Sequence, residues 1–400
     1  MVRGPRRTPA GEAARRDAAA SGLAGELMAS GAFAAGLVWP PEPWSRTRSL
    51  ADSLRHNPFL MAPMAGVTDA AYRLMARGGG AALAYSEMVS VAGIHYKSEK
   101  TWELVDPNPE EPELAVQLFG SDPDHFREAA PLVSERLGSR LALVDVNMAC
   151  PVPKVTKSGA GSALLDEPVL AADIVRAARE ALDGCGRREV PVTVKIRIGR
   201  RPGDVVGPEF ARRMVAAGAA AVAVHGRLAS QMYRGQSNAS EVRRVVEAID
   251  VPVVASGDAL DAARAARLLR ETGAAGCFVA RGSYGNPWVF RQAGEELASS
   301  SAQGSSGGVA TVAPHVRLAA FRLHVRLLEA TGAHIARARS LAGWYLRGVP
   351  EAAAWRERAM HCMGLDDYLA LADELEASLE GPLPATFGIS NGKNPEKCSV

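Results

Sequence analysis

Residues 141–161 read LALVDVNMACPVPKVTKSGAG. An almost wholly apolar run ends in Asn147 and Cys150, and a loop rich in proline, lysine and glycine follows it. Apolar runs of this length are typical of strands in a parallel sheet that is covered by helices. Seven further runs have the same apolar body with small or polar residues at the carboxyl end; they lie at 59–66, 82–88, 114–120, 190–199, 220–227, 251–258 and 276–282.

Amphipathic stretches rich in alanine, arginine, glutamate and leucine separate most of these runs. Pro168 follows two acidic residues as a helix start, and Gly273 marks a helix end. Eight strands that alternate with helices predict an α/β fold, a (β/α)8 TIM barrel. A doubly wound open sheet is the alternative, which is disfavoured because no GxGxxG motif follows the first strand.

The rest of the chain predicts other kinds of structure. ASSSAQGSSGG at 298–308 is typical of a flexible linker, and the residues after it have only helical patterns. The predicted division is a disordered extension at 1–50, the barrel at 51–296, a Ser/Gly-rich linker at 297–313, a small all-helical C-terminal domain at 314–382 and a disordered tail at 383–400. The Ala- and Arg-rich extension could instead be a targeting peptide, although its acidic residues disfavour that.

Composition excludes several classes of protein. An apolar fraction of 47% and a charged fraction of 22% are typical of a globular protein. The net charge is only +2, so nucleic-acid binding would need a local basic patch. The five cysteines have no CxxC spacing, which indicates a reducing compartment, the cytoplasm, and no structural zinc. The apolar run near the N-terminus is too short to span a bilayer. We therefore expect neither a metal nor a membrane as partner. The oligomeric state does not follow from composition, and a monomer is the expectation.

In a TIM barrel the chemistry is located at the carboxyl ends of the strands. The residues that fall at those ends are Pro63, Met64, Ala65, Gly66, Glu87, Gln117, Asn147, Cys150, Lys195, Arg197, His225, Arg227, Ser256, Gly257, Asp258, Ala280, Arg281 and Gly282. Polar groups thus gather at one end of the barrel while the strand bodies stay apolar. This segregation predicts the functional site there.

Some of these residues indicate a phosphate and a flat ring as ligands. An anion could be bound by two segments with small residues, Ser-Gly-Asp at 256–258 and Ala-Arg-Gly at 280–282, the second of which also has an arginine. Ordinary turns have the same composition. Lysine is rarely buried without a task, so Lys195 could stabilise negative charge on a bound ring. Gln117 and His225 taken alone would be ordinary strand-end residues. The evidence is their joint placement.

Cys150 allows two interpretations. A free cysteine is most often a buried structural residue. A free thiol is mostly protonated at neutral pH, so Cys150 could instead act as a general acid, and Pro151 and Pro153 would stiffen its loop. Lys154 and Lys157 would favour the thiolate or would contact phosphates.

Together these motifs resemble the tRNA-dihydrouridine synthases, and most closely the bacterial B-type branch. The resemblance covers about residues 57–290 and is carried by APMAGVTDAAYR, SEM, VQLFG, NMACPVPKVTKSGAGSALL, VKIRIG, VHGRLASQMYRGQSN, ASGD and ARGSYGNPWVF, with WYLRGVPEA at 344–352 in the helical domain. The family reduces the C5–C6 double bond of particular D-loop uridines in tRNA. It uses FMN that is re-reduced by NADPH.

The resemblance implies a role for each strand-end residue. The residues expected to bind FMN are Pro63, Met64 and Ala65 along the ring, Gln117, Lys195 and His225 at its polar edge, and Ser256, Gly257, Asp258, Ala280 and Arg281 at the phosphate. Asn147 and Arg197 would bind the uracil. Hydride transfer to C6 would leave an anion that Cys150 protonates at C5. The uridine would first have to flip out of its loop and stack on the flavin.

Three positions depart from the family pattern: Ala149, Ser256 and Ala280 stand where it usually has Gly, Asn and Gly. Each is small and keeps the backbone contacts. Two alternatives are an FMN barrel oxidoreductase acting on a free pyrimidine and a catalytically inactive tRNA-binding protein. The first would not need an arginine-rich helical domain. The presence of Cys150, Lys195 and His225 disfavours the second.

The helical domain is predicted to contact the tRNA. The arginines that recur at spacings of three to five for part of its length are Arg317, Arg322, Arg326, Arg337 and Arg339. Arginine–phosphate contacts would position the tRNA without reading its sequence. The last helix is acidic and would leave this cationic surface one-sided. Provided that the truncated barrel stays folded, removal of the residues after Trp288 is expected to leave an FMN-binding, NADPH-oxidising barrel with weakened tRNA binding.

Overall fold

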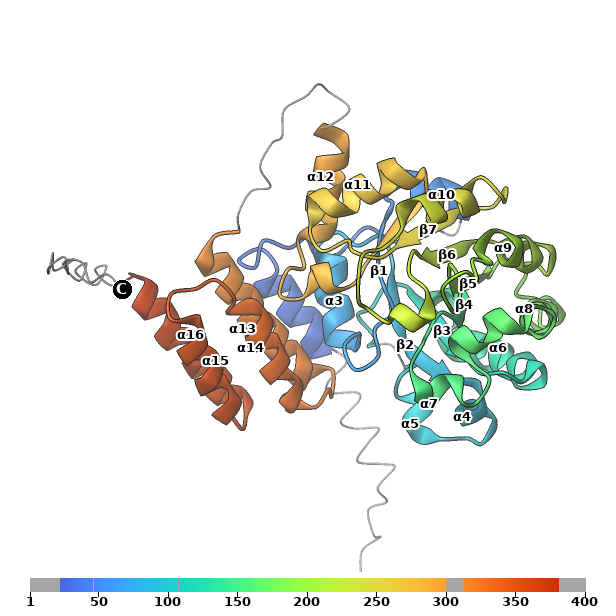
Figure 1. Ribbon diagram of the computed structural model, residues 1–400. Helices are drawn as coiled ribbons and strands as arrows, with labels where there is room; N and C mark the ends of the chain where they lie inside the picture. The colour runs from blue at the N-terminus through green and yellow to red at the C-terminus, as the bar shows by residue number, and fades with distance from the viewer. Residues whose placement is uncertain (1–21, 46, 107, 300–311, 381–400) are drawn as a thin grey trace, which may run out of the picture.

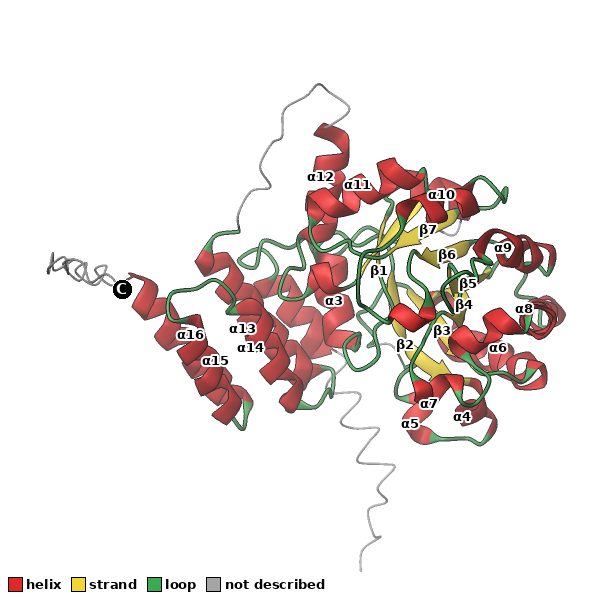
Figure 2. Ribbon diagram, viewed as in Figure 1, coloured by secondary structure: helices red, strands yellow, loops and turns green. Residues whose placement is uncertain are grey.

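The structure is a computed structural model of the chain, and it describes residues 22–45, 47–106, 108–299 and 312–380. Eight parallel strands form a closed barrel in chain order (Figures 1 and 2). They are β1 Phe59–Met61, β2 Ala84–Ser90, β3 Leu114–Phe119, β4 Leu141–Met148, β5 Val192–Arg197, β6 Val222–His225, β7 Val253–Ser256 and β8 Gly276–Val279. The predicted (β/α)8 barrel is confirmed. Most strands are shorter than the predicted runs because the last residues of those runs belong to the loops that follow. We call the carboxyl ends of the strands, together with these loops, the mouth of the barrel.

Helices surround the barrel on its outer side (Figure 2). They are α3 Ala70–Gly78, α4 Val91–His95, α5 Glu99–Trp102, α6 Pro123–Leu137, α8 Pro168–Gly184, α9 Gly207–Ala216, α10 Ala239–Val246, α11 Ala262–Thr272 and α12 Val289–Ser299. Two further helices are placed differently: α2 Leu50–His56 packs through Leu54 on residues inside the barrel, and α7 Pro153–Thr156 lies in the loop after β4. Side-chain caps begin several of them: the Asp69 carboxylate accepts from Tyr72 N–H and the Asp261 carboxylate from Arg264 N–H. Gly273 ends α11 in the left-handed conformation, as predicted.

The helical domain consists of α13 Pro314–Ala330, α14 Ala338–Tyr345, α15 Ala352–His361 and α16 Leu365–Glu380. It lies beside α3 in Figure 1. Leu74 and Met75 of α3 share one buried cluster with Phe321 and Leu328 of α13. The barrel and the helical domain are therefore packed through a common hydrophobic core.

The prediction that residues 1–50 form a disordered extension is wrong for the part from residue 22 onward. Residues 22–31 are helical, and Ala24 and Met28 are buried in the cluster shared with α13. Trp44 is buried with Leu54 and Leu60 near the amino ends of the strands. The Ala-rich composition concealed an amphipathic helix whose apolar face has a partner. Residues 1–21, the linker residues 300–311 and the predicted tail 383–400 lie outside the described residues.

The prediction that the arginines of the helical domain form a one-sided cationic surface is wrong for two of them, because both are paired with carboxylates. Arg322 forms ion pairs with Asp373 at 2.6 Å and Glu376 at 2.8 Å, because the acidic α16 packs against α13. Arg337 pairs with two carboxylates of the barrel. Arg326 and Arg347 are exposed, so these two are better placed to meet phosphates.

Candidate active site at the barrel mouth

Strand register brings the predicted residues together at the mouth. Around the barrel, Gln117 pairs with Asp145, Asn147 with Lys195, Arg197 with His225, and His225 with Ser256. Parallel strands in register place residues that are far apart in sequence side by side. The convergence expected from the strand ends is therefore present, whereas the roles of these residues towards FMN and uracil stay predictions.

A buried chain of side-chain hydrogen bonds connects β3, β4 and β5. Gln117 Nε2 donates to Asp145 Oδ2 at 2.7 Å, and Asn147 Nδ2 donates to Gln117 Oε1 at 2.7 Å. Thr193 Oγ1 donates to Asp145 Oδ1 at 2.6 Å. Because both oxygens of Asp145 have a donor, the carboxylate fixes the orientation of the Gln117 amide.

Asp145 was missed by the sequence analysis. It is 1% exposed, and burial raises its pKa to about 6, against the hydrogen bonds from Gln117 and Thr193 and the charge of Lys195. It stands in the body of a strand, and not at the strand end where polar groups were expected. The signal that could have found it is a lone acidic residue within an apolar run.

Lys195 lies beside this chain of hydrogen bonds on β5. Burial lowers its pKa to about 8, and Arg197 acts in the same direction, while Asp145 opposes the shift. A buried ammonium group near its titration point is typical of a functional site. It can stabilise negative charge on a ligand as long as it keeps its proton.

The loop that carries Cys150 is held by backbone contacts. Asn147 Oδ1 accepts from the Cys150 N–H at 3.0 Å, and Ser162 N–H donates to the Cys150 carbonyl at 2.9 Å. Gly161 has a φ of +62°, and a Cβ there would lie 2.6 Å from that same carbonyl. The loop therefore requires glycine at this position. Cys150 itself is half-buried.

Arg197 braces the same loop from β5. It is 2% exposed. Its Nε donates to the Ala149 carbonyl at 2.9 Å, and its Nη1 donates to the carbonyls of Leu228 and Met232 at 2.9 and 3.0 Å. Burial lowers its pKa to about 10. Asn147 and Arg197, which the resemblance assigns to uracil binding, thus already position the Cys150 loop through contacts within the chain.

His225 is surrounded by cationic side chains. Burial lowers its pKa well below 6.5, and Lys195, Arg197, Arg227 and Arg281 act in the same direction. The imidazole is therefore neutral at physiological pH. A neutral imidazole can accept one hydrogen bond and donate another.

The loops after β7 and β8 meet at Asp258. Arg227 Nη2 donates to both oxygens of Asp258 at 2.7 Å, and Ser237 N–H donates at 2.8 Å. Burial opposes ionisation of Asp258, but these bonds outweigh it and lower its pKa. Arg281 contacts the same carboxylate at 3.3 Å and is 43% exposed on its side chain. Arg227, for which the sequence indicated a strand-end position but no role, therefore connects the loop after β6 to the loop after β7.

Two features of these loops fit a phosphate group. Gly257 has a φ of +123°, and a Cβ there would lie 2.3 Å from Ser237 Oγ, so only glycine fits. The Ser237 hydroxyl is buried without a hydrogen-bond partner within the described part of the chain. Unpartnered buried hydroxyls are costly unless a ligand or water satisfies them. Small residues, a free hydroxyl and Arg281 make a suitable set of donors for the predicted phosphate of FMN.

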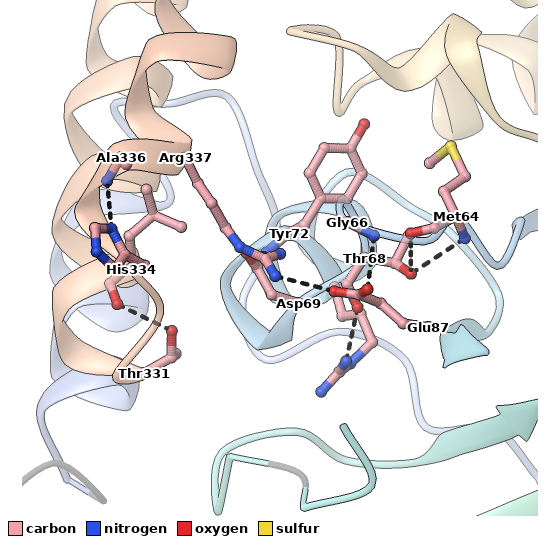
Figure 3. A network of polar contacts seen from close by, with 12 residues as sticks. Met64, Gly66, Thr68, Asp69, Tyr72, Glu87, Thr331, His334, Ala336 and Arg337 are labelled. Atoms are coloured by element: carbon pink, nitrogen blue, oxygen red, sulfur yellow. Dashed lines mark hydrogen bonds and ion pairs between the residues drawn. The ribbon is translucent and has the colours of Figure 1, made fainter. Parts of the chain in front are cut away.

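The loop after β1 fits the flat ring. Pro63 and Met64 are half-buried, and Ala65 and Gly66 are exposed. A Cβ at Gly66 would meet nothing within 4 Å, so the loop faces open space. Glu87, in the middle of β2, accepts from Gly66 N–H at 2.6 Å and pairs with Arg337 of the helical domain (Figure 3). Glu87 was noted at a strand end without a role, and Arg337 was expected to contact tRNA.

Among the described residues, no three histidine, cysteine, aspartate or glutamate side chains are placed to hold a metal ion. Within the same part of the chain, no helix is both long and apolar enough to cross a membrane.

Comparison with known proteins agrees with the geometry of the mouth. The family model described as Dihydrouridine synthase (Dus) matches residues 60–380. A probable tRNA-dihydrouridine synthase 1 from Synechocystis is 34% identical over 84% of this chain and 90% of its own length. The tRNA-dihydrouridine synthase B of Xanthomonas axonopodis is 34% identical over 82% and 95%. The protein of the same name from Shewanella oneidensis is 38% identical over 59% and 70%.

Proposed function

Because the chain belongs to the dihydrouridine synthase family, we propose that it reduces uridine in the D-loop of tRNA to dihydrouridine, with FMN as cofactor and NADPH as reductant. The observation that carries the proposal is the mouth itself. It combines a half-buried thiol, a buried lysine and, beside Gly257, a buried serine hydroxyl with no partner among the described residues, all within one ring of strand ends. These are the donor types that a flavin and a uracil require.

FMN would be held by the residues that line the mouth. Its phosphate would contact Gly257, Ser237 and Arg281, and its ring would lie along Pro63 and Met64. When bound, FMN supplies the hydride for C6 of the uracil, after reduction by NADPH.

The residues of this chain supply the proton and the charge stabilisation. The Cys150 thiol would donate its proton to C5 of the uracil from the face opposite the flavin. Asn147 and Arg197 would keep the thiol at that position, because they bind the N–H and the carbonyl of the peptide bond between Ala149 and Cys150. Lys195 would stabilise negative charge on the ring system as long as it is protonated.

The direct test combines the purified protein, FMN, NADPH and tRNA from a strain in which this gene has been deleted. Dihydrouridine formed in that tRNA would be mapped by mass spectrometry. We expect a yellow protein that forms dihydrouridine in the D-loop. A colourless protein that rejects FMN, or a yellow one that leaves tRNA unchanged, would contradict the proposal.

Lys195→Met is expected to weaken FMN binding about tenfold, as loss of a hydrogen bond from a charged group does. The wild-type affinity should also decrease as the pH rises through about 8, because Lys195 loses its proton there. The affinity of the variant should lack this step. Fluorescence titration of the apoprotein between pH 6 and 9 measures both effects, and an unchanged affinity with an unchanged pH profile would exclude Lys195 from the flavin site.

Arg326→Glu combined with Arg347→Glu is expected to weaken tRNA binding and to flatten its salt dependence. The slope should lose close to one power of salt concentration for each phosphate contact removed. Arg188→Glu is the matched control, since Arg188 is exposed and precedes β5 at the amino end of the barrel. Filter binding at several salt concentrations reports the slopes. Equal slopes for all three proteins would mean that the mouth alone holds the tRNA.

A further inference from the structure

One arginine of the helical domain reaches two carboxylates of the barrel. Arg337 Nη1 lies 2.8 Å from Asp69 Oδ2, and Nη2 lies 3.1 Å from Glu87 Oε1 (Figure 3). The arginine side chain is 33% exposed, whereas those of Asp69 and Glu87 are 13% and 11% exposed. The ion pairs are therefore largely shielded from water and from salt.

The same two carboxylates hold the loop at 63–69 at its middle and at its junction with α3. The second oxygen of Glu87 accepts from Gly66 N–H at 2.6 Å. The second oxygen of Asp69 accepts from Tyr72 N–H at 2.9 Å and so begins α3. Arg337 thus binds one oxygen of each carboxylate, while the other oxygen binds Gly66 of the loop in the case of Glu87 and the first turn of α3 in the case of Asp69. Only one side chain, that of Glu87, separates Arg337 from the backbone of Gly66 in the loop, so a substitution at Arg337 is expected to alter the position of the loop.

A charge count shows that the barrel alone does not neutralise this region. Glu111 is also buried here and receives two hydrogen bonds from Arg73, at 2.5 and 2.8 Å. Three carboxylates then face two arginines, a net charge of −1, and loss of Arg337 makes it −2. Burial raises the pKa of Asp69, against the Tyr72 N–H and Arg337, which favour its charged form. Removing one partner from a shielded ion pair leaves an uncompensated charge, which is strongly unfavourable.

The helical domain is fixed against the mouth close to this point. Trp344 of α14 stacks on Tyr284 of the loop after β8, with ring centroids 4.1 Å apart and an angle of 13°. A Cβ at Gly285 would lie 2.6 Å from the Trp344 backbone. The end of α14 is therefore packed against the loop after β8.

We propose that Arg337 is a positioning residue that couples tRNA docking on the helical domain to the geometry of the flavin loop at 63–66. The inference rests on the proposed function, because it assumes FMN in the mouth and tRNA on the helical domain. Coupling between two ligands is reciprocal. Bound tRNA should therefore change the affinity for FMN, and this change should depend on Arg337.

The test compares four variants by FMN titration of the apoprotein, with and without saturating tRNA. Arg337→Met should weaken FMN binding about tenfold, the effect of one lost charge-assisted hydrogen bond, and should abolish the effect of tRNA on it. Arg337→Lys should restore part of the affinity. Asp69→Asn added to Arg337→Met should also restore part of it, because asparagine still caps α3 while the net charge returns to −1.

Arg358→Met is the matched control, since Arg358 pairs with Glu374 at 2.5 Å within the helical domain. It should match the wild type in FMN affinity. If Arg337→Met does not fold, the double variant carries the test. Wild-type affinity and wild-type tRNA coupling in Arg337→Met, or in the double variant where the single one is unfolded, would overturn the proposal. A wild-type protein that rejects FMN would instead overturn the proposed function itself.

Discussion

Cys150→Ala is expected to bind FMN and to oxidise NADPH as the wild type does, while dihydrouridine formation falls by about 10²–10⁴-fold. This is the usual contribution of a general acid. The effect should be confined to the step that needs a proton at C5 of the uracil. Mass spectrometry of tRNA after a timed reaction measures it, and stopped-flow absorbance follows the flavin separately.

The structure explains why this variant should stay folded. The loop is held by the Cys150 backbone, through Asn147 on one side and Ser162 on the other, and not through the sulfur. Cys185→Ala is the matched control, because Cys185 is exposed at the end of α8. Dihydrouridine formation at the wild-type rate in Cys150→Ala would make Cys150 a structural residue, the other interpretation of the sequence.

The positions of the strand ends could be predicted from the sequence, because each strand has an apolar body and polar residues near its carboxyl end. Parallel register then brings Gln117, Asn147, Lys195 and His225 to one mouth, although they are scattered along the chain. The (β/α)8 fold and the place of the site follow from this one regularity. The resemblance to the synthases added the expected chemistry, and the match to the family confirms that resemblance.

Contacts between distant elements could not be read in this way. Asp145 is hidden in an apolar strand, and its importance lies in bonds to Gln117 and Thr193 of the neighbouring strands. Arg337 and Glu87 are 250 residues apart, and nothing local to either one indicates the other. The helix at 22–31 was missed for the same reason, because its apolar face matters only when α13 is present to cover it.

A chain that ends at Ser299 is not expected to give a stable barrel. From the sequence, removal of the residues after Trp288 was expected to leave an FMN-binding barrel, on the condition that the truncated barrel stays folded. The structure argues against this, because Leu74, Met75 and Trp288 are at most 2% exposed and belong to the cluster shared with α13. Exposure of each such side chain costs about 1.5–3 kcal/mol.

The total loss is comparable with the stability of a whole domain, about 5–15 kcal/mol. Loss of Arg337 adds an uncompensated carboxylate at the mouth. We therefore expect the truncated protein to be insoluble, or to melt at least about 10 °C below the full chain. A chain that ends at residue 380 is the control, since it keeps α13–α16 and should melt like the full chain.

The measurement is a thermal melt of both truncated proteins, with FMN content read from their visible spectra. A soluble fragment ending at Ser299 that melts with the full chain and binds FMN with equal affinity would show that the shared cluster adds no stability. It would also remove the basis for coupling through Arg337. If the fragment instead unfolds while the chain ending at residue 380 does not, the helical domain is part of the fold that builds the mouth. Its contact with tRNA and its support of the flavin loop would then be two functions of one set of helices.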